Sequence, residues 1–407
     1  MTRSGEGSAH HMADDIGKAV LRGWSTAADP VRAVREIGDA LGGRPLALLC
    51  LFLSPEYAGA PFARAASAAF PGTLIVGCTT AGEITPAGMR DNSVVAIGFA
   101  ASHFAAVATT LDPAAPPAAL AERVLDLIAA GRQADPEMPH RFSFLLNDGM
   151  ARHEDHIVSA VSPSLGDIPH FGGSAGDGLE FNETWLLWDG AFRKDISILT
   201  LIRSRRPIEV FRIENFSPGP VRMVVTEANP ETRLVSRIND EPAAEEYARL
   251  IGNSPGGLSP FVFAAHPVLV QAGGSYHVRA IQKVEENGEI RFFSAVDRGL
   301  ILTMAERHDL LEHLEGALQG VVKGRAVEAM IGFDCVLRKI EITASQLTDE
   351  MSDLMRRYRV LGFNTYGEQH GAMHVNQTFT GVAIFADADA PDAPDASALP
   401  VGAADGQ

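Results

Sequence analysis

The sequence predicts an α/β protein with two mixed-sheet lobes and flanking helices, and three observations indicate this class. The first half of the chain alternates short apolar runs, such as residues 46–53 and 142–147, with helical patterns. The second half combines closely spaced apolar runs, typical of antiparallel strands, with further helical patterns. Between the halves, residues 215–223 contain two prolines and a glycine, which indicate a division near residue 217.

These observations predict four segments along the chain. Residues 25–217 form an N-terminal lobe and residues 218–385 a C-terminal lobe, because both stretches hold enough apolar residues for a core. Residues 1–24 are expected to be disordered or extended, and residues 386–407 to form a disordered acidic tail. Small and polar residues dominate both ends, and such segments cannot bury enough apolar surface to offset the entropy of ordering.

The elements of the first lobe follow from apolar periodicity and turn residues. Asp189-Gly190 lies between two apolar runs and predicts a hairpin. Helical patterns cover residues 117–131 and 153–163. The predicted strands are residues 46–53, 73–78, 94–100, 104–111 and 142–147.

Periodicity and turn residues also order the second lobe. A helix is predicted after residues 239–240, and residues 261–296 predict three or four antiparallel strands with a turn at residues 287–288. Residues 306–322 and 337–357 predict two helices, each with one apolar stripe. The other predicted strands are residues 223–228, 232–238, 326–335, 359–365 and 376–385.

Composition limits the class of function. The chain has 407 residues and a formal net charge of −17. Nucleic-acid and anionic-membrane surfaces need clustered Lys and Arg, so this acidic balance argues against both. The cysteines Cys50, Cys78 and Cys335 are an odd number in apolar surroundings, which indicates a reducing compartment. Because we find neither an apolar signal segment nor a membrane-spanning stretch, we expect a cytoplasmic protein.

A glycine-rich stretch at residues 171–178, FGGSAGDG, is the first candidate ligand site. It includes Gly173, Gly176 and Asp177. Glycine permits both tight turns and the close approach of a ligand. The stretch matches neither of the glycine patterns typical of nucleotide binding. It therefore predicts either a structural turn or the lining of a pocket.

The connection within residues 361–381 is the second candidate, because it carries many side chains that can bind a ligand. It includes Tyr366, Glu368, His374 and Gln377. Such groups either satisfy buried polar groups at a junction between lobes or line the mouth of a pocket. Both interpretations stay open at the level of sequence.

His266 is the third candidate, at the centre of FAAHPVLV. This stretch predicts an apolar, buried strand in which Pro267 marks an edge or a bulge. A histidine there is either a hydrogen-bonded core residue or an axial ligand facing the apolar slot that haem needs. Burial favours neutral imidazole, the form that binds a metal. His277 lies in another segment that could line such a pocket.

Two further patterns favour structural interpretations over catalysis. Cys78 has no identifiable base beside it, so a structural thiol is favoured over a catalytic nucleophile. His153 and His156 are three residues apart, whereas the zinc motif HExxH needs a spacing of four. We therefore expect no enzyme activity, with a cysteine-dependent hydrolase that uses Cys78 as an alternative.

Four motifs in order carry a family resemblance: VGCTTAGEI, FGGSAGDGLEF, EPAAEEYARLIG and LGFNTYGEQHGAMHVNQTFTG. Together they resemble the FIST sensory domain, in its N-terminal and C-terminal parts, over residues 25–385. The resemblance implies a FIST-like fold and a ligand-binding sensor module of signalling proteins. Amino acids have been proposed as ligands for the wider family.

Within that family, SPEY, FAAHPVLV, FDCVLRKIE and residues 365–381 are similar to the NosP branch of nitric oxide sensing proteins. This resemblance implies a stand-alone sensor that binds b-type haem and regulates a partner histidine kinase. It favours His266 as the axial ligand, with His374, His277 and Tyr366 as other cofactor-binding candidates. The alternatives are a FIST sensor of an amino acid or another small polar ligand, and a purely structural partner of signalling complexes.

Overall fold

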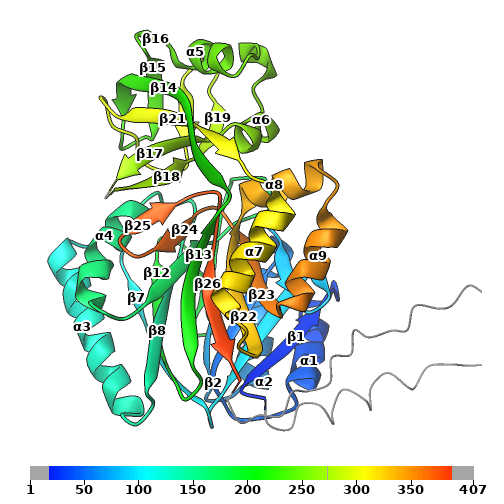
Figure 1. Ribbon diagram of the computed structural model, residues 1–407. Helices are drawn as coiled ribbons and strands as arrows, with labels where there is room; N and C mark the ends of the chain where they lie inside the picture. The colour runs from blue at the N-terminus through cyan, green and yellow to red at the C-terminus, as the bar shows by residue number, and fades with distance from the viewer. Residues whose placement is uncertain (1–17, 273, 387–407) are drawn as a thin grey trace, which may run out of the picture.

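Three six-stranded sheets form a large body, and an eight-stranded sheet forms a smaller upper lobe (Figure 1). The computed structural model describes residues 18–272 and 274–386. The mixed α/β class predicted from the sequence is confirmed. Within the described residues, no helix is both long and apolar enough to cross a membrane.

Each sheet of the body draws strands from widely separated parts of the chain, and its strands are named in the order in which they pair. The first sheet consists of β1 (Val20–Ser25), β6 (Val94–Ala100), β2 (Leu46–Leu53), β3 (Leu74–Thr79), β10 (Leu186–Trp188) and β11 (Ala191–Arg193). The second consists of β7 (Phe104–Leu111), β12 (Ser197–Ser204), β8 (His140–Asn147), β9 (His170–Ser174), β24 (Glu368–His370) and β25 (Met373–Val375). The third consists of β13 (Ile208–Glu214), β26 (Thr378–Phe385), β22 (Val327–Cys335), β23 (Val360–Thr365), β4 (Glu83–Thr85) and β5 (Gly88–Arg90).

These sheets share one topology, so the body is built from three successive units of the chain. Apart from a hairpin, each unit has four strands in chain order: β1, β2, β3 and β6 in the first, β7, β8, β9 and β12 in the second, and β13, β22, β23 and β26 in the third. The second and third strands of each unit form a parallel pair: β2 with β3, β8 with β9, and β22 with β23. The last strand of the unit, β6, β12 or β26, then returns antiparallel between the first and second strands. This repeat is not apparent in the amino-acid sequence.

Each unit also contributes one hairpin to the sheet of another unit. The hairpin β4–β5 of the first unit pairs with β23 of the third, and β10–β11 of the second unit pairs with β3 of the first. The hairpin β24–β25 of the third unit pairs with β9 of the second. The exchange is therefore cyclic, and no unit completes its sheet with its own chain.

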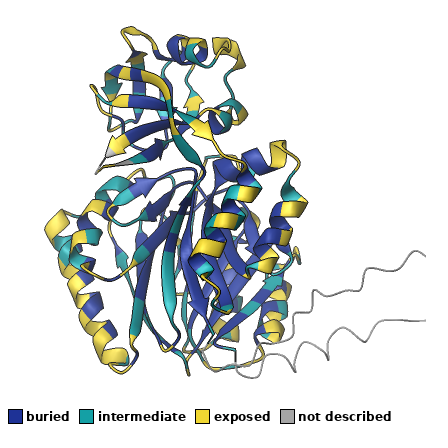
Figure 2. Cartoon of the chain, in the orientation of Figure 1, coloured by how far each residue is buried: buried dark blue, intermediate teal, exposed yellow. Residues whose placement is uncertain are grey.

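Helices cover the outer face of each sheet, and apolar side chains fill the space between the sheets (Figure 2). The rings of Phe52 and Phe363 have centroids 4.6 Å apart, and Phe333 and Phe171 continue this centre. The body helices are α1 (Pro30–Leu41) and α2 (Ala60–Ala69) on the first sheet, α3 (Pro117–Ala134) and α4 (Glu154–Leu165) on the second, and α7 (Leu310–Val322), α8 (Val336–Ala344) and α9 (Thr348–Arg357) around the third.

The upper lobe is an insertion in the third unit. In the first two units, short connections at residues 26–29 and 112–116 join the first strand to the first helix. In the third unit, the whole lobe lies at this point, between β13 and α7. Its elements are β14 (Phe216–Asn229), β15 (Leu234–Ile238), β16 (Glu241–Pro242), α5 (Ala243–Leu250), α6 (Pro260–Ala265), β17 (Val268–Ala272), β18 (Ser275–Arg279), β19 (Ile281–Val284), β20 (Ile290–Phe292) and β21 (Ile301–Arg307).

The two crossings between body and lobe lie side by side. His308 N donates to the carbonyl of Asn215 over 3.1 Å, and the Asn215 side chain donates to the carbonyl of His308 over 3.2 Å. The chain thus enters the lobe within two residues of the division predicted at residue 217. It returns to the body at α7, so residues 218–385 contain both the lobe and much of the body.

Two predicted elements are wrong in form. The stretch around His266 is not one strand: Pro260 begins α6, and the helix ends before Pro267, because a residue that precedes proline disfavours helical geometry. The helix predicted over residues 337–357 is two helices, α8 and α9, separated where Gln346 has a φ of 59°. The predicted hairpin at Asp189-Gly190 is confirmed. Of the terminal segments, residues 1–17 and 387–407 lie outside the described residues, and residues 20–25 form β1.

Three glycines at equivalent positions of β3, β9 and β23 allow the parallel pairs to pack. A Cβ atom at Gly77, Gly172 or Gly362 would lie within 3.0 Å of the carbonyl oxygen of the residue opposite, which no real Cβ atom tolerates. We expect Gly362→Ala to lower the free energy of unfolding by more than about 2 kcal/mol, as overpacking against a backbone does.

Gly316→Ala is the matched control for this prediction. Gly316 lies on the exposed side of α7, where a methyl group would meet open space, so alanine there should stabilise by about 1 kcal/mol through helix propensity. Urea unfolding followed by circular dichroism measures both variants. Equal stability of the two variants would contradict the close packing inferred for β22 and β23.

Candidate functional site

The candidate site lies at the seam between the top of the body and the upper lobe. The parallel strands of the body end there, and Ala81, Cys335 and Tyr366 pack in one apolar cluster with residues of the lobe such as Val278 and Phe293. Carboxyl ends of parallel strands are the usual place for ligand sites in open α/β sheets. The seam therefore combines the expected edge of the body with a second surface that faces it.

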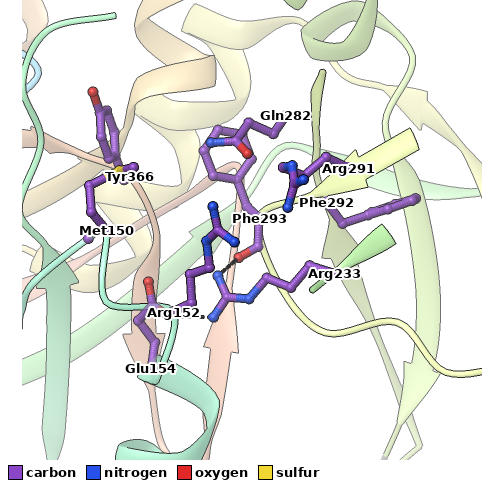
Figure 3. A pocket seen from close by; sticks show the side chains of 10 residues that line it. Met150, Arg152, Glu154, Arg233, Gln282, Arg291, Phe292, Phe293 and Tyr366 are labelled. Atoms are coloured by element: carbon purple, nitrogen blue, oxygen red, sulfur yellow. Dashed lines mark hydrogen bonds and ion pairs between the residues drawn. The ribbon is translucent and has the colours of Figure 1, made fainter. Parts of the chain in front are cut away.

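A pocket opens in this seam (Figure 3). The pocket is partly open to solvent and has a cavity volume of about 20 Å³. The body contributes Gly149, Met150, Arg152, Glu154 and Tyr366, and the lobe contributes Arg233, Gln282, Arg291, Phe292 and Phe293. A ligand in this pocket would contact both parts of the protein at once.

Three arginines from three separate segments meet at the pocket. The Arg233 guanidinium donates to Glu154 Oε2 over 2.6 Å and to the carbonyl of Phe293. Arg291 pairs with Glu285, with 2.5 Å between Nε and Oε1, and donates to the carbonyl of Thr232. These two arginines of the lobe are thus held in place by carboxylates and carbonyls.

Arg152 differs from the other two arginines. It is exposed, and it forms no hydrogen bond or ion pair with any described residue. Desolvation, followed by the positive charges of Arg291 and Arg233, lowers its pKa. Its φ of 60° is left-handed, a conformation that costs a non-glycine residue about 1–2 kcal/mol and that often occurs at functional sites. Figure 3 shows its guanidinium between Met150 and Arg233.

Tyr366 forms an aromatic wall of the pocket. Its ring stacks on Phe181 with centroids 4.5 Å apart and lies 6.5 Å from Phe293. Its hydroxyl donates to Asp177 and accepts from the backbone N–H of Asp177 over 3.1 Å. Burial and the neighbouring Asp177 raise the pKa of Tyr366, so it is neutral near pH 7.

The predicted glycine-rich residues lie beside the pocket but do not line it. The carboxylate of Asp177 accepts backbone N–H groups of residues 181–183 and so orders that loop. Gly173 packs against the rings of Phe333 and Phe363, and Gly176 lies against the backbone of Ala81. These contacts are those of close packing between units of the body.

The polar residues of the segment 361–381 are nearly all buried at the junction of the hairpin β24–β25. Glu368 is fully buried, and its Oε2 accepts from Thr378 N over 3.0 Å. The Gln377 side chain donates to the carbonyl of Ala264 in the lobe over 3.1 Å. His374 is buried, its pKa is lowered by that burial, and its carbonyl accepts from Arg279 of the lobe over 3.2 Å. These residues join body to lobe.

The two remaining candidate histidines lie away from the pocket. His266 is exposed at the end of α6, and its carbonyl accepts from Tyr247 over 2.6 Å. His277 is buried in β18, with its Nδ1 3.9 Å from Glu214 Oε1. The structure therefore does not bring His266, His277 and His374 around one cavity. Within the described part of the chain, no three His, Cys, Asp or Glu side chains are grouped to hold a metal ion.

The arginines are the site residues that sequence reasoning missed. Arg152 belongs to the stretch RHEDH, whose histidines drew attention instead. Arg233 and Arg291 neighbour each other because Leu234 pairs with Arg291 in β15 and β20. No local pattern joins residues so distant in sequence.

Cys78 does not have the surroundings of a nucleophile. It is fully buried in the central core, and burial raises its pKa well above the usual value. The neutral thiol is a poor nucleophile. This environment is that of a structural cysteine.

Comparison with known protein families covers most of the body and the whole lobe. The FIST N domain matches residues 47–241, and the FIST C domain matches residues 243–370. The chain belongs to the FIST family. FIST domains are sensory domains of signal transduction rather than catalytic domains. Among curated proteins, no relative of this FIST protein is found.

Two buried carboxyl groups of the FIST body occupy equivalent positions. Glu83 begins β4 and Glu368 begins β24, and each is the first residue of an exchanged hairpin. Ser54 and Ser93 donate to Glu83 over 2.9 and 2.7 Å, as the equivalent Cys335 and Thr378 do to Glu368. Burial raises the pKa of Glu83 to about 7 despite its hydroxyl donors.

The raised pKa of Glu83 predicts a dependence of stability on pH. Between pH 4.5 and about 7, the folded protein holds a proton on Glu83 that the unfolded chain has lost. The stability from this group is complete below pH 4.5 and decreases as the pH rises to about 7. We expect Glu83→Gln to remove a decrease on the order of 3 kcal/mol.

Urea unfolding of both proteins between about pH 5 and pH 8 measures this difference in slope. Glu122→Gln on the exposed face of α3 is the matched control, and its curve should follow the wild type. Parallel curves for the wild type and Glu83→Gln would show that Glu83 does not change its protonation in this range.

Proposed function

We propose that this protein is a sensor of a small polar ligand that binds without haem in the seam pocket, between body and upper lobe. The observation that carries the proposal is that one pocket draws polar side chains from both parts, with Arg152 and Glu154 on one side and Arg233, Gln282 and Arg291 on the other. A ligand that contacts both parts would bind an arrangement that keeps the seam together more tightly than one in which the two parts are separated. That difference is what any ligand-driven conformational change requires.

The output of this sensor is a changed surface for a signalling partner. Sensory FIST domains act in signal transduction, and the NosP-like resemblance supports a histidine kinase as the partner. The acidic net charge of −17 supports a protein partner rather than nucleic acid.

Haem-based sensing of nitric oxide is the second proposal, supported by the NosP-like motifs. The surroundings of His266 do not fit an enclosed haem, because the side chain is exposed and lines neither the seam pocket nor the hollow between β3, β7 and α3. That second hollow, of about 420 Å³, is lined mainly by apolar residues but by no histidine of the described chain. His374 is buried beside Gly367 and Asn376, so haem at His374 would need rearrangement of the hairpin β24–β25.

An absorption spectrum of the haem-reconstituted protein, with and without nitric oxide, separates the two proposals. We expect no stoichiometric Soret band, because the cavity volume of the seam pocket is only about 20 Å³ and no histidine of the described residues lines it. In parallel, a panel of small polar ligands should include one that raises the melting temperature through binding to the folded state.

A stoichiometric Soret band that shifts with nitric oxide would overturn the first proposal and support the second. His266→Ala, His374→Ala and His277→Ala would then locate the ligand, provided that circular dichroism shows an intact fold for each. Loss of the band in His266→Ala alone would assign the iron to His266.

A further inference from the structure

We propose that the ligand of the seam pocket is a small anion that carries a carboxylate or phosphate group, and that Arg152 is the residue that receives it. This inference rests on the proposed sensor function and names its ligand class. It follows from the charge of the pocket, from the hydrogen-bond donors of Arg152 that no described residue accepts from, and from the size of the pocket.

The pocket carries an excess of positive charge in a strongly acidic chain. Arg152, Arg233 and Arg291 face it, whereas the carboxylates beside them are Glu154 and Glu285. Glu285 is shared further, because Lys283 Nζ lies 3.2 Å from its Oε2. Three arginines against two carboxylates leave one positive charge without compensation, in a protein of net charge −17.

Arg152 is the position where this excess is concentrated. Desolvation, followed by the charges of Arg291 and Arg233, lowers its pKa, so its charge is less stable there than in water. Glu154 already accepts a hydrogen bond from Arg233, and no described residue accepts a hydrogen bond from Arg152. A guanidinium has five donors in a planar fork that matches carboxylate and phosphate oxygens. An anion would satisfy this fork and reduce the repulsion between the arginines.

The shape of the pocket selects a small ligand. The cavity volume is about 20 Å³, enough for a small group, and the pocket is partly open to solvent. Tyr366 and Phe293 form an apolar side next to the charged side. A carboxylate or phosphate on a short organic stem fits this division, with the anionic group at the arginines and the stem at the rings.

The same geometry explains how the anion would act on the seam. Arg152 belongs to the body, whereas Arg233 and Arg291 belong to the lobe. Without an anion, Arg152 is repelled across the seam by Arg233 and Arg291, and this repulsion opposes the attraction between Arg233 and Glu154. With an anion between them, the same charges attract it from both sides and favour closure.

The test measures binding to the full-length protein by calorimetry and thermal melting at low ionic strength. The probes are succinate, inorganic phosphate and succinamide, the last being a neutral analogue of succinate. We expect succinate or phosphate to bind and raise the melting temperature, and succinamide to have no effect. Arg152→Gln should weaken the anion at least tenfold, whereas Arg132→Gln, an exposed arginine of α3, should bind as the wild type does.

The ligand-free variant gives a second readout. Because Arg152 has no partner among the described residues and is repelled by its neighbours, Arg152→Gln should melt at the same temperature as the wild type or higher. A fall of several degrees would show that Arg152 makes contacts within the protein, and it would overturn its role as a receiver for an anion.

The remaining outcomes separate the failure of this inference from that of the proposed function. If succinamide binds as well as succinate, and Gln282→Ala weakens both while Arg152→Gln changes neither, the seam is a sensor site but its ligand class is wrong. If the haem-reconstituted protein shows a Soret band that responds to nitric oxide and no probe binds at the seam, both the inference and the proposed function fail.

Discussion

The cyclic exchange of hairpins is the constraint on which the rest of the body depends. Because β4–β5, β10–β11 and β24–β25 each complete a sheet of another unit, none of the three units can finish its own sheet. Almost every pairing at these junctions joins residues far apart in sequence, as Glu83 and Phe363 show. Such a topology orders the whole body together, since the entropy lost in closing long loops is offset only when the contacts among all three units have formed.

The exchange also accounts for polar residues that resemble a site in the sequence. The first residue of an exchanged hairpin pairs near the end of a parallel strand of the sheet that it joins. In two of the three sheets this residue is a glutamate, Glu83 or Glu368, and hydroxyl or thiol groups donate to it. The second unit has Leu186 at this position and carries its acid one strand away, at Asp148, which accepts from Thr184. Buried carboxyl groups of this kind need donors on every side, so they fix the register of the entering hairpin.

Local features of the fold could be predicted from the sequence, whereas features that arise between distant segments could not. Asp189-Gly190 specifies its hairpin through left-handed conformations at both residues, so four or five residues contain the whole signal. The strand expected at His266 failed because its apolar residues suit a short helix as well as a strand, and Pro260 and Pro267 decide the boundaries. Of the predicted candidates, Tyr366 lines the pocket and Asp177 holds its hydroxyl. The arginines could not be foreseen, because only the docking of the lobe on α4 brings Arg152 and Arg233 together.

The insertion of the upper lobe breaks the symmetry of the three units and adds a part that is not interlocked with them. The body is interlocked, so displacing one unit would break the sheets of its neighbours. The lobe has its own antiparallel sheet and its own core, and it is joined to the body by two adjacent crossings at Asn215 and His308. Its seam with the body holds polar contacts such as that of Arg233 with Glu154, which can re-form with water, and an apolar cluster that includes Phe293 and Tyr366. Displacement of the lobe would leave the sheets of the body intact but would expose this cluster, and a ligand bound in the seam would act on that balance.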